Sequence, residues 1–228
     1  MTPDLIRTTW EVPTIEKLEG KHVLITRLDP DNDVDDLYEV SHSKNEYKSV
    51  WEYMQYGPFG DKNEMRTWLQ SLTEDSDPIF YTVFSKALRK KVGMYSILNI
   101  KPKMGRVELG NIWYSPLVQK TVVNTEATYL FLCYLFDELH YRRIEWKCDD
   151  RNEASKYAAI RLGLSYEGLF RQHMVVKGKN RDTAWFAMIS KEWAESKGDF
   201  ERYFSNPTLS LTKLHGRQEH SLPDKLDL

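Results

Sequence analysis

Cysteine, long apolar runs and excess charge are all scarce in this chain of 228 residues. Its only cysteines are Cys133 and Cys148, one in an expected helix and the other in an expected strand. That placement resembles neither a disulfide framework nor a zinc site. We therefore expect a reducing compartment, no disulfide and no bound metal.

Apolar residues never run long enough to cross a bilayer, which takes roughly 18 or more in succession. The N-terminal stretch MTPDLIRTTWEVP also lacks the apolar run of a signal peptide. These two absences predict a cytoplasmic protein with no membrane segment.

Charge of one sign is not in excess either, because 32 Lys and Arg face 34 Asp and Glu. A protein that neutralises a phosphate backbone needs a basic surplus, so nucleic acid is not an expected partner. What the chain does have is 41% hydrophobic and 13% aromatic residues, enough for one well-buried main domain.

The first third of the chain alternates strand and helix patterns. HVLITRL (22–28) alternates as a strand, and Val34, Leu37 and Val40 follow with helical spacing. Asp61 with Glu64 three residues later forms a capping box, so a second helix is expected to begin near Lys62.

The rest of the chain begins with an antiparallel meander and continues as a β-α-β-α-β-β run. The expected meander strands are 79–85, 92–100 and 106–114. The expected later elements are helix 124–140, strand 142–149, helix 152–163 closed by Gly163, and strands 169–177 and 182–190 around the turn GKNR. This order predicts an α+β fold, with a mixed central sheet flanked by helices.

Three stretches carry a family resemblance: ELGNIWYSPLVQKTVVNTEA, DDRNEASKYAAIRLGLSYEGLFRQ and VVKGKNRDTAWFAM. With the order of elements, they resemble the GNAT superfamily of acyl-CoA N-acyltransferases, in the branch similar to bacterial RimJ/RimL enzymes. The resemblance covers residues 18–193 and implies an acetyltransferase domain there. Prolines and alternating charge indicate an N-terminal arm (1–17), and the polar end of the chain indicates a partly disordered C-terminal extension (194–228).

A polar turn that leads into a helix is an anion site on physical grounds, because unpaired N–H groups and the positive dipole end point the same way. In GNAT proteins this turn holds the pyrophosphate of acetyl-CoA. Here it comprises Gln119, Lys120, Thr121, Val122, Val123 and Asn124. Of the superfamily pattern Q/R-x-x-G-x-G/A, this chain retains only Gln119. An ordinary β-α turn is the alternative to a pyrophosphate site.

The strand before this turn lends its backbone to the pantetheine arm in the family, which implies a role for Ile112, Trp113 and Tyr114. Core packing is the alternative for their side chains. Asn152 is a candidate cofactor contact, and a helix N-cap is the alternative role; the two roles are compatible.

Ser155 lies one turn into that helix, where the RimJ/RimL-like branch often places a serine. The resemblance implies that its hydroxyl donates to the departing CoA thiolate. A plain first-turn helix serine is the alternative. Many other GNAT enzymes use a tyrosine seven residues after the asparagine, but that position is Ala159.

Acetyl transfer to an amine also needs a group that removes a proton. Glu108, expected on the same strand face as Gly110 and Ile112, is one candidate, and His173 is the other. A strand-end salt bridge for Glu108 and a packed, hydrogen-bonded ring for His173 are the alternatives.

The aromatic segment WEYMQYGPFG lies where GNAT folds form the acceptor side. Trp51, Tyr53, Tyr56 and Phe59 are therefore acceptor-pocket candidates, and core packing is expected for at least two of them. The expected activity is transfer of acetyl from acetyl-CoA to a primary amine of a protein N-terminus or a small molecule, by a monomer or homodimer. A non-catalytic acyl-CoA-binding or regulatory module is the alternative.

Overall fold

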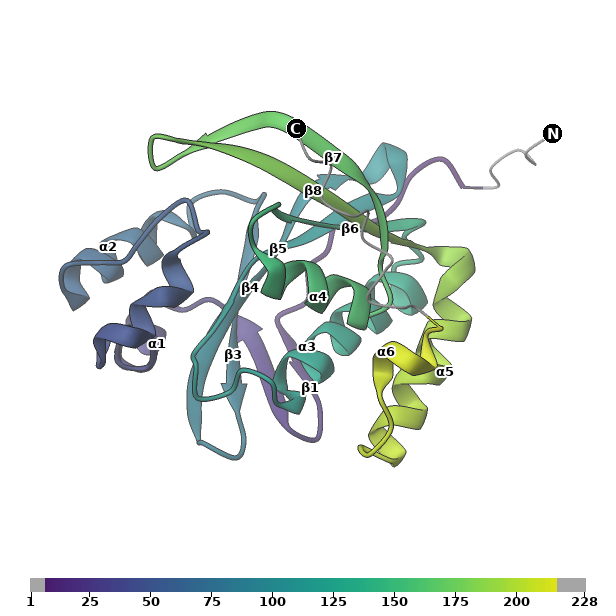
Figure 1. The fold of residues 1–228 in the computed structure, drawn as a ribbon, viewed down its shortest axis with the longest axis horizontal. Coiled ribbons are helices and arrows are strands. Elements are labelled where there is room, and N and C mark those ends of the chain that lie inside the picture. The colour runs from purple at the N-terminus through teal and green to yellow at the C-terminus, as the bar shows by residue number, and fades with distance from the viewer. Residues whose placement is uncertain (1–6, 217–228) are drawn as a thin grey trace. The chain divides into compact units, whose positions relative to one another are not determined.

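A computed structural model describes residues 7–216, and the chain divides into two compact units, Met1–Tyr141 and Arg142–Leu228 (Figure 1). The last part of the expected C-terminal tail, 217–228, lies outside the described residues. None of the helices within 7–216 is long and apolar enough to cross a membrane.

The first unit contains a sheet in which five strands follow one another in chain order, each antiparallel to the next. The strands are β1 (Lys17–Glu19), β2 (Val23–Arg27), β3 (Ile79–Ser85), β4 (Lys90–Lys101) and β5 (Arg106–Tyr114). The expected meander of β3, β4 and β5 is confirmed. The short β1 was not expected, because three residues are too few to show an alternating pattern.

Helices cover both faces of this sheet. On one face α1 (Pro30–His42) and α2 (Lys62–Ser71) bury Leu37 and Leu69 in a cluster with Met94 of β4. On the other face lies α3 (Val122–Cys133), where the ring of Phe131 stacks on Tyr95 with 4.9 Å between centroids. Neighbouring positions on β4 thus face opposite helical layers.

Local signals explain where these helices begin. Asp61 caps α2 by accepting a hydrogen bond from the Glu64 N–H at 2.8 Å, as the sequence predicts. The Glu64 carboxylate accepts from the Gly60 N–H at 2.6 Å, one residue before the cap. Two short helical segments were not expected: η1 (Asn45–Trp51) and η2 (Pro102–Met104). The expected helix 124–140 is present as α3 and its π-helical continuation η3 (Tyr134–Glu138).

The N-terminal arm is anchored within the first unit from residue 7 onward. Trp10 is buried, and its indole N–H donates to the His140 carbonyl at 2.6 Å. Its backbone N–H donates to the Pro102 carbonyl at 3.1 Å. Trp10 therefore ties the arm to two loops far along the chain, one through its side chain and one through its backbone.

The second unit contains three antiparallel strands in the order β6-β8-β7. Its elements are β6 (Arg143–Asp149), α4 (Glu153–Arg161), β7 (Ser165–Val176), β8 (Lys179–Ile189), α5 (Ser190–Ser205) and α6 (Leu211–Leu214). Gly163 follows α4 with φ +88°, in line with its expected role as helix terminator.

Two details of the second unit differ from expectation. The β7–β8 reversal consists of Lys177 and Gly178 alone, since Val176 already pairs with Lys179. Both turn residues have positive φ, which suits a tight two-residue hairpin. The sequence gives little helical signal beyond Trp193, in the expected C-terminal extension, but α5 continues there and buries Trp193 and Phe200.

Candidate active site

β5 carries a bulge. Gly110 pairs with Ser96 and Trp113 with Met94, so Asn111 and Ile112 together lie opposite one residue of β4. Asn111 has φ +51°, and the two bulge residues are half-buried between buried neighbours. A bulge leaves a backbone group outside the ladder, so this is where β5 can offer its main chain to another molecule.

The bulge also resets which side chains share a face. Strict alternation predicts Ile112 on the face of Glu108, but the inserted residue interrupts that alternation. Trp113 lies on the α1–α2 face, with its ring centroid 4.7 Å from that of Trp51. Glu108 pairs with Leu98, two positions along β4 from Ser96 and four from Met94, so Glu108 faces the same side as Trp113.

Glu108, a candidate base, is only 6% exposed. Its Oε2 accepts a hydrogen bond from Asn99 Nδ2 at 2.7 Å. Its Oε1 would lie 3.5 Å from a Cβ added at Gly110, so the carboxylate extends along the strand toward the bulge. The structure therefore gives this buried carboxylate an amide partner.

Local hydrogen bonds and one left-handed residue fix the conformation of the predicted pyrophosphate turn. Gln119 Nε2 donates to the Tyr114 carbonyl at 3.1 Å. Lys120 has φ +60°, a left-handed conformation that usually favours glycine. Thr121 caps α3, and its hydroxyl accepts from the Val123 N–H at 3.3 Å.

The first turn of α3 has donors to spare. Within the described part of the chain, the N–H groups of Val122 and Asn124 donate to no other group, and the turn contains no acidic residue. Asn124 Oδ1 accepts from the Thr128 hydroxyl at 3.3 Å, so this side chain extends along the helix away from its first residue. The asparagine at a glycine position thus leaves the helix end uncovered.

In the second unit, Asn152 caps α4 as expected, because its Oδ1 accepts from the Ser155 N–H at 3.0 Å. The Ser155 hydroxyl accepts from the Trp146 indole N–H at 3.0 Å. Burial raises the pKa of the Cys148 thiol to about 12, and a hydrogen bond from Ser155 acts in the opposite direction. Trp146 thus orients the Ser155 hydroxyl, which lies within reach of the Cys148 sulfur.

His173, the other candidate base, lies exposed on β7. Its Nδ1 is 3.0 Å from the Thr183 hydroxyl. Its ring contacts Phe170 and Trp185 edge-on, at centroid distances of 5.5 and 6.1 Å. His173 is therefore an exposed ring that is hydrogen-bonded to Thr183 and in contact with two aromatic side chains.

The four aromatic candidates for the acceptor side separate into two pairs. Trp51 and Phe59 are buried in the core of the first unit, with ring centroids 5.3 Å apart. Tyr53 and Tyr56 are half-buried, and the Tyr56 hydroxyl donates to Asn111 Oδ1 at 3.2 Å. Two of the four side chains therefore lie in the core, and the sequence predicts at least two.

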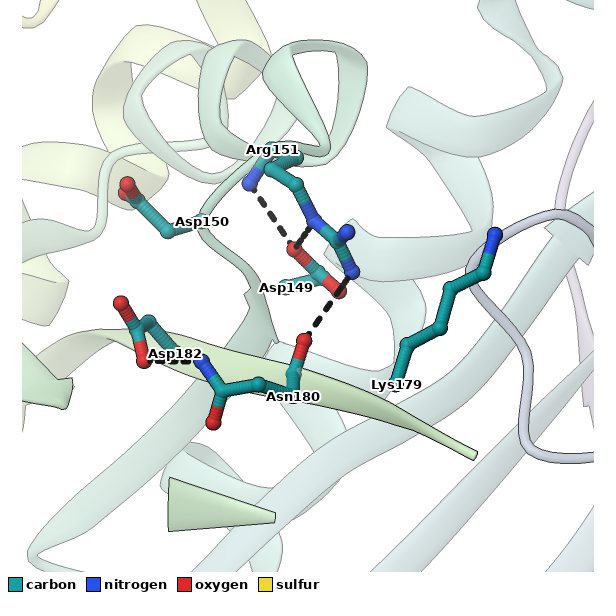
Figure 2. A pocket seen from close by; sticks show the side chains of 6 residues that line it. All are labelled: Asp149, Asp150, Arg151, Lys179, Asn180 and Asp182. Carbon is teal, nitrogen blue, oxygen red and sulfur yellow. Dashed lines mark hydrogen bonds and ion pairs between the residues drawn. The ribbon is translucent and has the colours of Figure 1, made fainter. Parts of the chain in front are cut away.

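A polar hollow of about 440 Å³ in the second unit was missed by the sequence analysis. Figure 2 shows its six lining residues: Asp149, Asp150, Arg151, Lys179, Asn180 and Asp182. Its only sequence signal is the charged run that immediately precedes Asn152.

The hollow's carboxylates are occupied by neighbours within the unit. Burial opposes ionisation of Asp149, but hydrogen bonds from the side chain and backbone of Arg151 hold the pKa of Asp149 below its usual value. Asp182 accepts from Asn180 Nδ2 at 2.9 Å and from the Gln172 N–H at 2.6 Å. Across residues 7–216, no group of three or more His, Cys, Asp or Glu is placed to hold a metal ion.

Comparison with known proteins identifies the family. The model of the Acetyltransferase (GNAT) domain matches residues 22–165. A GCN5-related N-acetyltransferase from Brucella melitensis has a crystal structure that is 33% identical, with a TM-score of 0.89, over 92% of this chain and 99% of that one. The crystal structure of a GNAT-family acetyltransferase from Chromobacterium violaceum, described as probable, is 35% identical, with a TM-score of 0.78, over 85% and 96% of the two chains.

A Bacillus subtilis protein with the provisional name of ribosomal N-acetyltransferase, YdaF, is 27% identical over 105 residues, which are 46% of this chain and 57% of the relative. This relative agrees with the RimJ/RimL-like resemblance, and the α+β GNAT fold expected from the sequence is confirmed. The chain therefore belongs to the GNAT family and is an acetyltransferase.

Proposed function

We propose that this protein transfers an acetyl group from acetyl-CoA to a primary amine by direct attack, without a covalent enzyme intermediate. The observation that carries the proposal is the start of α3. There Lys120 adopts a glycine-like backbone, and the N–H groups of Val122 and Asn124 are available to a pyrophosphate. The family supplies acetyl-CoA as the donor.

In the proposed reaction the neutral amine nitrogen attacks the thioester carbon, the C–S bond breaks, and the thiolate leaves with a proton. Backbone N–H groups of the Ile112–Tyr114 segment would polarise the thioester carbonyl. Glu108 would take the proton from the amine, directly or through one water. Ser155 would donate to the thiolate.

We favour Glu108 over His173 as the base because of their surroundings. Glu108 is buried beside the bulge and bound on one oxygen by an amide. His173 is exposed on β7. A buried carboxylate with a fixed orientation is better placed to act on a positioned amine than a side chain open to bulk water.

For the acceptor we propose the N-terminal amine of a protein, which the ribosomal name of the Bacillus subtilis relative supports. The test measures CoA thiol release with peptides that carry a free N-terminus, with their N-acetylated counterparts, and with a polyamine, an amino acid and a drug-like amine. Turnover only with free-N-terminal peptides is expected. Turnover only with small amines would overturn the protein acceptor, and none with any amine would overturn acetyl transfer.

The second candidate function is a non-catalytic acyl-CoA-binding module. It is favoured by Val122 and Asn124 at the positions where the superfamily pattern has glycine or alanine. This alternative predicts that acetyl-CoA raises the melting temperature while no amine releases CoA. Thermal shift and thiol release measured on one preparation separate the two functions.

A further inference from the structure

A chain of three side chains connects the aromatic segment of the first unit to the β5 bulge. The Tyr56 hydroxyl donates to Asn111 Oδ1 at 3.2 Å, and Asn111 Nδ2 donates to Ser96 Oγ at 2.9 Å. Ser96 Oγ in turn donates to the Gly110 carbonyl at 3.0 Å. We call Tyr56, Asn111 and Ser96 the Tyr56 relay.

The direction of the relay is fixed by its two ends. Ser96 has one hydroxyl hydrogen, which is directed to the Gly110 carbonyl, so Ser96 Oγ can only accept from Asn111. The amide oxygen of Asn111 must then face Tyr56, whose phenol donates. Burial raises the pKa of Tyr56, so the phenol keeps the hydrogen that the relay needs.

The relay acts on the residue that makes the bulge. Asn111 has φ +51°, a region that side chains other than glycine seldom occupy and that asparagine tolerates better than most. Such a conformation persists where the surroundings hold it. Here the side-chain amide of Asn111 forms two hydrogen bonds, one with Tyr56 and one with Ser96, and these support the conformation.

We infer that Asn111 is a positioning residue for acetyl transfer, because the Tyr56 relay holds the bulge in the one geometry that presents the Ile112–Tyr114 backbone to the thioester. The inference rests on the proposed function. It makes the half-buried Tyr56 a determinant of backbone geometry in β5, in addition to any contact it makes with an acceptor. The pyrophosphate turn, 119–124, shares no residue with the relay, so loss of the relay should change kcat more than KM for acetyl-CoA.

The experiment compares Tyr56→Phe with Tyr38→Phe in the full chain. Each variant loses one phenol hydroxyl from the same face of the sheet, but the Tyr38 hydroxyl donates to the Gly60 carbonyl at 3.5 Å, outside the relay. Two quantities are measured, hydrogen exchange of the peptide covering 110–114 and steady-state kinetics with acetyl-CoA. Asn111→Gly is a third variant, which permits the left-handed backbone and removes both amide bonds.

We expect faster exchange at 110–114 in Tyr56→Phe and Asn111→Gly, with no change there in Tyr38→Phe. We expect kcat to fall about five- to tenfold in Tyr56→Phe, the effect of one lost hydrogen bond, and further in Asn111→Gly, with KM for acetyl-CoA within about twofold. A purely structural role would instead lower stability and leave kcat at the parental value.

Unchanged exchange at 110–114 in Tyr56→Phe overturns the inference, whatever the activity. Changed exchange with parental kcat overturns the catalytic role of the relay. If the parental protein acetylates no amine, the proposed function fails, and exchange alone then decides whether the relay holds the bulge.

Discussion

At the scale of single residues, His42 is the clearest case of a protonation state set by its neighbours. This buried side chain lies at the end of α1, stacked on Tyr38 with ring centroids 4.5 Å apart. Its Nε2 accepts from the Phe59 N–H at 3.0 Å, so the ring hydrogen lies on Nδ1, 2.8 Å from the Ser41 hydroxyl. Burial, and then the positive charge of Lys48, lower the pKa of His42.

The free energy of unfolding should therefore depend on pH through His42. Because its folded pKa is lower than the unfolded value near ~6.5, the unfolded chain binds the proton first as pH falls. This contribution is complete above about pH 6.5 and is lost below it, down to the lowered folded pKa. Urea unfolding at a series of pH values should show a smaller decline over this window in His42→Gln than in the parent. Equal slopes would contradict the assignment.

Ser155→Ala should lower turnover roughly 10- to 100-fold with little change in acetyl-CoA affinity, because the hydroxyl is proposed to donate to the leaving sulfur. The variant also leaves the buried Trp146 indole N–H without its acceptor, so unfolding should become about 1–3 kcal/mol easier. Trp146→Phe is the control, because it removes that donor and keeps the hydroxyl. Parental turnover in Ser155→Ala would remove Ser155 from the mechanism.

The identity of the base should show in the dependence of rate on pH. Glu108→Gln is expected to abolish the rising limb of the profile, and His173→Gln to retain it, with acetyl-CoA saturating in both assays. Two variants that both match the parent would mean that the amine loses its proton to water before it binds.

At the scale of secondary structure, the elements that the sequence predicts best are those with a regular period and clear end signals. The β3–β5 meander combines alternation with polar turns, and α2 has the Asp61 cap. The bulge could not be predicted, because one additional polar residue, Asn111, leaves the composition of the strand unchanged. The left-handed Lys120 is a similar case, since lysine gives no signal of positive φ.

One contact between elements should dominate the stability of the β1–β2 turn. The buried Glu126 carboxylate of α3 accepts from three successive backbone N–H groups, those of Lys21, His22 and Val23, at 3.0, 2.6 and 2.8 Å. Glu126→Ala should lower the free energy of unfolding by roughly 2–3 kcal/mol, because these donors lose a charged partner. Denaturant unfolding measures the loss.

Glu138→Ala is the matched control for that substitution. Glu138 is an exposed glutamate in η3, the segment that continues α3. Its replacement should change stability by no more than about 0.5 kcal/mol. Similar losses in the two variants would show that the effect comes from helix propensity rather than from the Glu126 carboxylate.

At the scale of the whole molecule, the sequence predicts the family and the order of elements more fully than the extent of the C-terminal helix. Trp193 and Phe200 lie seven residues apart and are both buried by α5, but polar residues fill most positions between them. A narrow apolar stripe of this kind gives a weak periodic signal. The surroundings of Glu108 and Ser155, for which we propose catalytic roles, likewise include partners, Asn99 and Trp146, that only the folded chain identifies.

Acetyl-CoA should stabilise the folded protein as a whole. A ligand that binds only the folded state at ~100 times its dissociation constant adds about 2.7 kcal/mol, which for a chain of this size raises Tm by roughly 5–10 °C. A melting curve with millimolar acetyl-CoA measures the shift, and desulfo-CoA is a control that keeps the pyrophosphate. A flat curve with both would contradict the proposed anion site at the start of α3.

The buried thiol beside Ser155 has a practical consequence for every such assay. Thiol reagents react with the thiolate, and a pKa of about 12 leaves Cys148 almost entirely protonated at neutral pH. Reagents that detect released CoA should therefore label Cys148 slowly in the native protein. Once the signal of the half-buried Cys133 has been subtracted with an acceptor-free blank, rapid colour would report the product, whereas delayed labelling of Cys148 would record the opening of the second unit.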